Sequence, residues 1–464
     1  QIGEGCEIVN GIIGYGCRLF YGVKAVRFIM GTNSQLKYGA RLINSYLGDN
    51  STISCCEVLN SLIFPGHEQH HNNSFLCAAL VMGQSNIAAG ATLGSNHNSR
   101  SADGELIAAR GFWPGLCVSI KHNSKFATFT LLAKGDYSHE LNIPFPFALV
   151  SNDVSKNQLS IMPAYWFMYN LYALARNAGK YLDRDKRLKK RQHIEYDFLA
   201  PDSINEIFTA LDLLKKLTAL SGNKNYSDDT PENVLIQEGQ NILEDQSNSI
   251  SNITIHRSGF ENSSRPVCIS KVKEAYRVYK ELIAYYGVTN LLDFITTQSI
   301  HSFEELQNAL PDKPVRLQWS NIGGQLLPVD SLQGLLHKIK DGFIQTWEEV
   351  HELYEENGKV YSEQKLQHAY ASLLELMNIE QLDAAAFKKL LLHTLNIKEW
   401  MVKNIYHSRA KDYQNEFRKM VYDNEKEMEV VVGKLEDNVF INQKKEELEN
   451  FKTSVENIIS EFRL

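Results

Sequence analysis

The 464-residue sequence lacks the features that would assign a compartment or an activity directly. No apolar run approaches the ~18 residues of a membrane-spanning helix, so we expect no membrane partner. The seven cysteines include no Cys-x-x-Cys pair, which argues against zinc sites and a disulfide framework. The net charge of −7 argues against non-specific binding to nucleic acid. We expect a cytoplasmic protein with reduced, buried thiols.

Phosphate-binding loops are also missing. Gly323 and Gly324 lie in the stretch Trp319–Gln325 without a surrounding GxGxxG or GKS pattern, so they predict a turn only. The helical stripes of the second half sustain no strict heptad, which favours an α-helical domain over a coiled coil.

What the first third of the chain does contain is a 17-residue period. Aligned segments begin at Ile8, Ala25, Leu42 and Val58, in steps of 17, 17 and 16 residues. A short fixed period predicts a solenoid, in which each coil buries its apolar face by stacking on the next. Residue 2 already begins a repeat, and proteins normally cover open strand edges, so we expect earlier coils in the natural chain.

A six-residue unit recurs within the coils: an aliphatic residue, a small residue, any residue, Gly or Asn, a small residue and any residue. Units begin at Ile2, Ile13, Met30 and Leu47 and, more loosely, at Leu36 and Ile87. The aliphatic side chain should point into a narrow prism, and the Gly or Asn should occupy a corner with positive φ. The side chains expected to face the interior are Ile2, Ile8, Ile13, Leu19, Leu36, Leu42, Leu47, Ile53, Ile87 and Leu93.

This pattern resembles the left-handed β-helix of the hexapeptide-repeat superfamily. That superfamily includes trimeric acyltransferases, the carboxy-terminal domains of sugar-nucleotide pyrophosphorylases, and γ-class carbonic anhydrases. The resemblance implies left-handed winding, a homo-oligomer, and transferase chemistry on a sugar-nucleotide or acyl donor. The whole chain resembles a family of Bacteroides proteins in which a β-helix precedes a helical domain. The glycine-rich signature of a nucleotidyl-transfer domain is absent, so pyrophosphorylase activity is not expected.

The repeats and the later stripes divide the chain into three parts. We expect a β-helix over residues 1–150, a linker over 151–200, and an α-helical domain over 201–464. The linker should contain a buried helix over 163–181, apolar almost all round, and then a basic cluster that is either a solvated segment or an anion site. The cluster comprises Arg184, Lys186, Arg187, Lys189, Lys190 and Arg191. A short strand is expected at 253–255, and helices at 332–354, 363–377, 384–402, 404–432 and 443–462.

A second repetition places a histidine ahead of asparagine and serine. It occurs at His71-Asn72-Asn73-Ser74, His97-Asn98-Ser99-Arg100 and His122-Asn123-Ser124-Lys125. Spacings of 26 and 25 residues predict one corner on successive coils, about 4.8 Å apart.

Three interpretations of these motifs are open. They form a structural corner ladder, or a transfer site in which one imidazole is a general base, or a metal site using His67 and His71, as in γ-class carbonic anhydrases. The catalytic candidates are His97, His122 and His71; the ligand-binding candidates are Arg100, Asn98, Asn123, Lys125 and Arg110. On this histidine edge we expect small-molecule binding or group transfer from a sugar-nucleotide or acyl donor. The opposing hypothesis is a non-catalytic scaffold whose helical half recruits partners.

Overall fold

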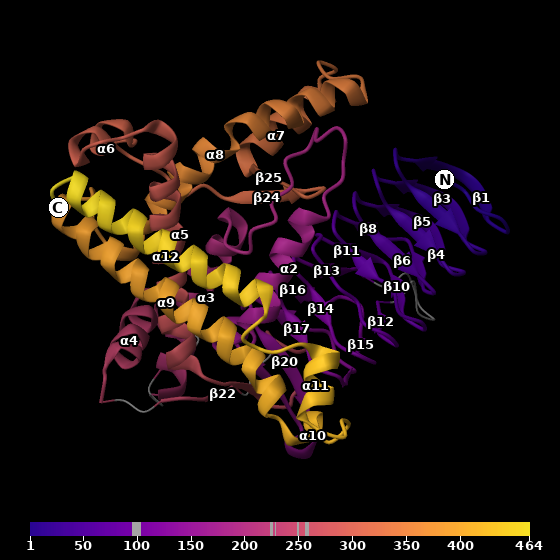
Figure 1. Ribbon diagram of the computed structural model, residues 1–464, viewed down its shortest axis with the longest axis horizontal. Coiled ribbons are helices and arrows are strands. Elements are labelled where there is room, and N and C mark those ends of the chain that lie inside the picture. The colour runs from indigo at the N-terminus through magenta and orange to yellow at the C-terminus, as the bar shows by residue number, and fades with distance from the viewer. Residues whose placement is uncertain (95–103, 223–225, 228, 248–249, 256–258) are drawn as a thin grey trace.

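The computed structural model describes residues 1–94, 104–222, 226–227, 229–247, 250–255 and 259–464. A parallel β-solenoid forms the N-terminal part, and helices form most of the remainder (Figure 1). The fold class expected from the sequence is thereby confirmed as a β-solenoid followed by a helical region.

The register between coils follows the 17-residue period. Ile8 pairs with Ala25, Ala25 with Leu42, and Leu42 with Val58, so the alignment of the repeats is confirmed. Continuing up the stack, Val58 pairs with Leu76. The strands of this face are β1 (Glu7–Ile13), β3 (Lys24–Met30), β5 (Arg41–Leu47), β7 (Glu57–Leu59), β10 (Phe75–Cys77), β12 (Thr92–Leu93), β15 (Ser119–Ile120) and β18 (Asp136–Tyr137).

Two further faces complete each coil. β5 is long enough to turn the corner, so its second half pairs with the next face. That face contains β8 (Leu62–Ile63), β11 (Ala79–Val81), β13 (Leu106–Ala108), β16 (Lys125–Phe126) and β19 (Asn142–Ile143). The third face contains β2 (Arg18–Phe20), β4 (Gln35–Lys37), β6 (Thr52–Ser54) and β9 (Glu68–Gln69), and then β14 (Trp113–Pro114), β17 (Leu131–Leu132) and β20 (Leu149–Asp153).

The corners account for the Gly and Asn positions of the six-residue unit. All of the predicted corner residues have φ between 54° and 74°: Gly5, Gly16, Asn33, Gly39, Asn50 and Gly90. Side chains other than Asn rarely adopt this left-handed conformation, and Gly adopts it without strain. The small residue that follows is buried where two faces meet, as Ser34 and Ser51 show.

Most of the expected interior positions are confirmed. Leu19, Leu36, Leu42, Leu47, Ile53, Ile87 and Leu93 are fully buried. The prediction is wrong for Ile2, which is 58% exposed, and Ile8 and Ile13 are only half-buried. These residues belong to the first coil, whose strand β1 pairs with β3 alone within the described chain.

At the far end, the sheet of the third face continues into the helical region. β20 pairs antiparallel with β21 (Gln158–Met162), which pairs with β23 (Val267–Ile269). β23 in turn pairs with β22 (Ile253–Ile255), the short strand expected from the sequence. Strands from beyond residue 250 therefore lie against the last coil of the solenoid.

The segment 163–181 is two helices, α1 (Tyr165–Tyr169) and α2 (Leu171–Asp183), separated at Asn170. α1 packs on the solenoid, where the Trp166 Nε1–H donates to the Phe129 carbonyl at 2.7 Å. The expectation of an all-round buried helix is wrong for α2, in which only Leu171 and Leu174 are buried. α2 packs against α9, and Ala175, Ala178, Gly179 and Leu182 of α2 border a cavity described below.

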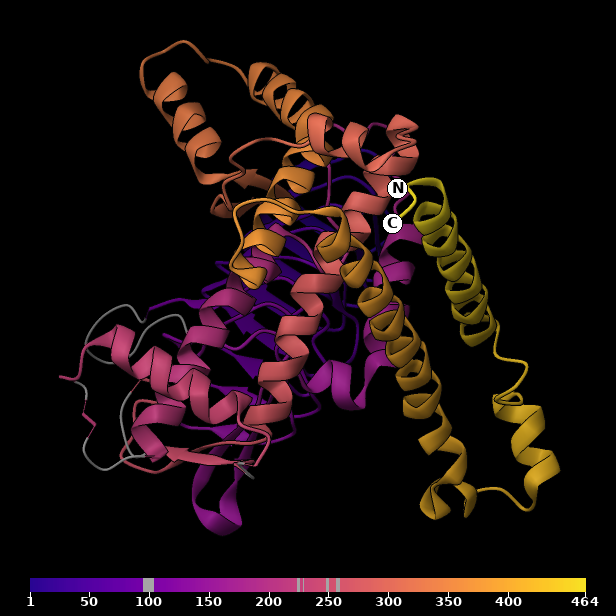
Figure 2. The ribbon, with the colours of Figure 1, turned by 90° about the vertical axis from the view of Figure 1, so that its left-hand side faces the viewer.

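The helical region is organised around α5 (Val272–Gln298), which contacts α3, α8 and α9. In Figure 2, α9 and α12 form a long hairpin closed by α10 and α11. The other helices are α3 (Pro201–Gly222), α4 (Glu232–Glu244), α6 (Phe303–Ala309), α7 (Val329–Lys340), α8 (Trp347–Met377), α9 (Ala384–Gln414), α10 (Glu416–Lys419), α11 (Glu425–Val432) and α12 (Val439–Glu461). Across the described ranges, every helix is too short or too polar to cross a membrane.

Helix boundaries differ from the sequence expectation in several places, and the helix expected at 404–432 is divided between α9, α10 and α11. The helix expected at 332–354 is interrupted, because Gly342 has a φ of 77° and Thr346 starts α8 with a capping box to Glu349. The break expected near residue 403 is absent, and α9 runs through it. The turn expected at Gly323 and Gly324 is confirmed between β24 (Trp319–Ile322) and β25 (Gln325–Pro328).

Candidate functional site

The described histidine motifs occupy different corners of the solenoid. His71 lies between β9 and β10, whereas His122 lies between β15 and β16. Because β10 and β15 belong to the same face, His71 precedes that face and His122 follows it. The expectation of one shared corner is therefore wrong for this pair. His97, Asn98 and Arg100 lie outside the described residues.

The corners explain why the motif recurs. Asn73 and Asn123 both have left-handed φ, at 64° and 58°, and Ser74 and Ser124 after them are buried. The Asn-Ser pair thus repeats the fourth and fifth positions of the six-residue unit. This geometry favours the structural interpretation of the motif, and it leaves Asn123 and Lys125 exposed at the corner and on β16.

His67 is fully buried inside the solenoid. Its Nδ1 lies 2.8 Å from Ser85 Oγ and its Nε2 lies 3.2 Å from Gln69 Oε1. Burial lowers the pKa of His67 to about 4, so the ring is neutral at pH 7. His71 is exposed beside His70, with ring centroids 4.3 Å apart. Within the described residues, no group of three or more His, Cys, Asp or Glu side chains is placed to hold a metal.

Arg110 connects the solenoid to the helical region. Its side chain is 2% exposed and forms a bidentate pair with Asp202, at 2.7 and 2.8 Å. It also donates to the Gln84 side chain and to the carbonyls of Glu195 and Asp197. The contacts of this predicted ligand-binding residue are thus to the protein itself.

A cleft of about 880 Å³ lies between residues 182–197 and the helices α5 and α8. Its lining includes acidic, amide and basic side chains from separate elements. Glu195 and Asp197 come from the segment before α3, Asn290 and Asp293 from α5, and Lys359 and Lys365 from α8. None of these residues belongs to a recognisable sequence motif, which is why sequence reasoning missed the cleft.

Glu195 is a charged and buried residue in the lining of this cleft. Its carboxylate is 7% exposed, accepts a hydrogen bond from the Tyr361 hydroxyl, and lies 2.9 Å from Lys365 Nζ. Burial alone would raise the pKa of Glu195, but Lys365 and Arg110 outweigh it and lower the pKa to about 2. Glu195 is therefore a permanent anion, neutralised by its own neighbours.

Asp197 and Asp293 are different, because their carboxylates reach the water of the cleft and pair with no cation of the described chain. Among the described residues, Asp197 Oδ1 accepts a hydrogen bond from the Leu199 N–H alone, at 3.2 Å. Burial on the remaining sides raises the pKa of Asp197, and the charge of Glu195 raises it further. The pKa of Asp293 is raised by the same two causes, burial and a neighbouring carboxylate, here Asp197. Both groups have hydrogen-bonding capacity that the protein leaves unused.

A second cavity of about 450 Å³ adjoins the cleft at His193, Tyr196 and Lys359. It borders the basic cluster, most of which is paired. Arg184 contacts Glu68, Arg187 contacts Asp185 and Asp49, Lys190 contacts Asp185, and Arg191 contacts Glu348. Lys359 is exposed and forms no ion pair with the described residues. The cluster therefore attaches its segment to the solenoid and to α8, and Lys359 is a cation of this cavity that has no ion pair among the described residues.

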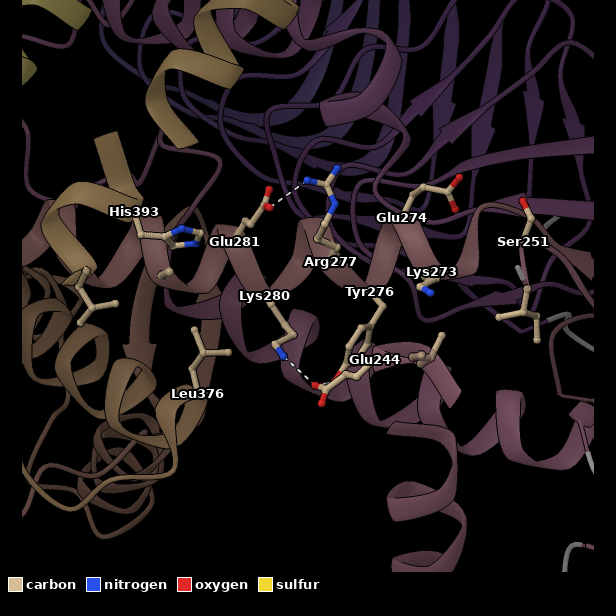
Figure 3. Close-up of a pocket in the computed structure, with 14 residues that line it drawn as sticks. Glu244, Ser251, Lys273, Glu274, Tyr276, Arg277, Lys280, Glu281, Leu376 and His393 are labelled. Carbon is tan, nitrogen blue, oxygen red and sulfur yellow. Dashed lines mark hydrogen bonds and ion pairs between the residues drawn. The ribbon is translucent and has the colours of Figure 1, made fainter. Parts of the chain in front are cut away.

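A groove of about 660 Å³ elsewhere contains two pairs of opposite charges in its lining (Figure 3). It lies along α5, between α4 and the ends of α8 and α9. Its Lys280 pairs with Glu244 at 2.8 Å, and its Arg277 pairs with Glu281 at 3.1 Å. Because these charges neutralise one another, the groove offers less to a charged ligand than the cleft does.

Comparisons with known proteins match two separate parts of the chain to families without an assigned function. Residues 1–218 match a domain of unknown function, DUF4954, and residues 302–462 match another, DUF6819. The chain is similar to a protein of Treponema pallidum (strain Nichols) described as an uncharacterized protein. The two are 46% identical over 450 residues, which is 96% of this chain. The chain spans 60% of the length of that relative.

Proposed function

We propose that the protein binds a sugar nucleotide in the cleft and takes part in transfer of its sugar. The observation that carries this proposal is the uneven lining of the cleft. Asp197, Asp293 and the Asn290 amide line the cleft, and carboxylates and amides suit sugar hydroxyls. Lys359 lies where the cleft meets the second cavity, and an amine there suits a diphosphate. The combined space is within the range of small-molecule sites.

The proposal also includes membership of the hexapeptide-repeat superfamily and left-handed winding. The six-residue unit and its left-handed corners support that resemblance. The superfamily handles both sugar-nucleotide and acyl donors, so an acyl donor is the first alternative. The seven cysteines are all free thiols, which supports a cytoplasmic location.

Calorimetric titration with uridine diphosphate glucose tests the proposal. Asp197→Asn and Lys359→Met should each weaken binding about 10-fold, the loss expected for one charged hydrogen bond. Lys189→Met is the matched control, because Lys189 is exposed on the same basic segment but does not line either cavity. Its affinity should equal that of the parent.

Other results of these titrations would favour the alternative hypotheses. Binding of acetyl-coenzyme A in place of the sugar nucleotide would favour the acyl donor. The histidine-edge hypothesis stays a prediction: it requires that His122→Ala or His71→Ala weaken binding while Asp197→Asn does not. Binding of neither probe would reject the proposal and favour the scaffold hypothesis.

A further inference from the structure

The cleft continues past Asp197 into a third cavity of about 350 Å³, between α2, α5 and α9. Leu182, Tyr196, Asp197 and Asn290 line both spaces. A molecule in the third cavity would therefore lie next to whatever occupies the cleft.

The walls of this cavity are mainly apolar. On α2, the small residues Ala175, Ala178 and Gly179 face it at helical spacing. On the opposite wall, α9 contributes Met401 and Ile405. A Cβ built at Gly179 would meet nothing within 4 Å, so the cavity has room beside α2 that is not filled by the described side chains.

One cation in this apolar setting lacks an anionic partner. Lys398 Nζ donates to the Tyr285 hydroxyl at 3.1 Å and lies 5.8 and 5.9 Å from the ring centroids of Tyr285 and Phe451. No carboxylate of the described chain forms an ion pair with it. The nearby Lys444 differs, because it pairs with Glu447 at 2.7 Å.

The electrostatic environment of Lys398 agrees with this geometry. Burial lowers the pKa of Lys398, and the more distant Glu447 and Asp197 only partly oppose that effect. A buried ammonium group is stabilised when an anion approaches it, and aromatic rings replace only part of the lost hydration.

We propose that this third cavity binds a small organic anion with an apolar body, namely a carboxylate on a short alkyl chain or an aromatic ring. The carboxylate contacts Lys398 and the body packs against α2 and α9. The inference goes beyond the proposed sugar nucleotide and does not depend on it.

Titration with octanoate and with octanol tests the proposal, because the two probes share an alkyl chain and differ in charge. The parent protein should bind octanoate more tightly than octanol. Lys398→Met keeps the apolar stem and should weaken octanoate binding about 10-fold while leaving octanol binding unchanged. Lys452→Met, on the exposed side of α12, is the control and should bind both probes as the parent does.

Gly179→Leu provides an independent test. It places a side chain in the empty space, and leucine is a better helix former than glycine, so α2 should remain folded. The Gly179→Leu variant should bind octanoate and octanol more weakly than the parent does. It should bind uridine diphosphate glucose as the parent does if the proposed function holds. If the parent protein does not bind octanoate but does bind uridine diphosphate glucose, the inference is overturned and the proposed function stands. Equal affinity for octanol and octanoate, or an unchanged Lys398→Met variant, also overturns it.

Discussion

Removal of the Arg110 side chain should destabilise the protein strongly. Arg110→Met would leave the Asp202 carboxylate, 14% exposed, without its bidentate partner, and would leave Gln84 and two carbonyls without their donor. Breaking one side of a buried ion pair costs about 3–5 kcal/mol, because the remaining charge stays buried without compensation. We expect a loss of this size in the free energy of unfolding, measured by urea denaturation followed by circular dichroism.

The matched control is Arg41→Met on the solenoid surface. Arg41 is 54% exposed and lies 3.7 Å from Glu57, so its loss should cost less than about 1 kcal/mol. The double variant Arg110→Met with Asp202→Leu should recover part of the stability, because no unpaired charge is then buried. The reasoning would be refuted if Arg110→Met lowered the free energy of unfolding no more than Arg41→Met does. It would also be refuted if the double variant were less stable than Arg110→Met.

Three further predictions concern the cores and the buried histidines. Leu47→Ala, inside the prism, should cost about 2–5 kcal/mol in urea denaturation, and a cost below 1 kcal/mol would contradict the register. Gly287→Ala should cost about 1–3 kcal/mol in the same assay, because its Cβ would lie 2.1 Å from Leu373 Cγ where α5 crosses α8. Burial lowers the pKa of His67 to about 4 and of His368 to about 3. Below pH 6.5 the two imidazoles therefore bind protons in the unfolded chain but stay neutral in the native protein. As the pH is lowered, the free energy of unfolding should fall by about 1.4 kcal/mol per pH unit for each ring. Denaturation at pH 7 and pH 5 should show a smaller drop for His67→Gln than for the parent.

The solenoid could be predicted in detail because its information is local and repeated. Each coil needs one aliphatic residue inside and one Gly or Asn at a corner, so Leu42 and Asn50 are recognisable from their neighbours alone. The same repetition misled the expectation that the histidine motifs share one corner, because the Asn-Ser pair recurs at different corners of the solenoid. His71 and His122 precede two of these corners, one before and one after the face that contains β10 and β15.

The cleft could not be predicted, because it is made by packing between distant segments. Asp197, Asp293 and Lys365 are separated by most of the helical region, and each resembles the many other charges in the sequence. What distinguishes Asp197 from Glu195 is the presence or absence of a paired cation, which depends on where α8 lies. Charge pairing across such distances leaves no periodic pattern in the sequence.

The sheet that joins the solenoid to the helical region has a consequence for the order of folding. Each coil pairs with residues about 17 positions earlier, as Leu42 does with Ala25, so coils can form one after another while the chain is being synthesised. The pairing of Leu159 with Val267 must instead wait until α3 and α4 have been made. During that interval β21 presents an unpaired edge, which is where a nascent chain would be most open to wrong pairing.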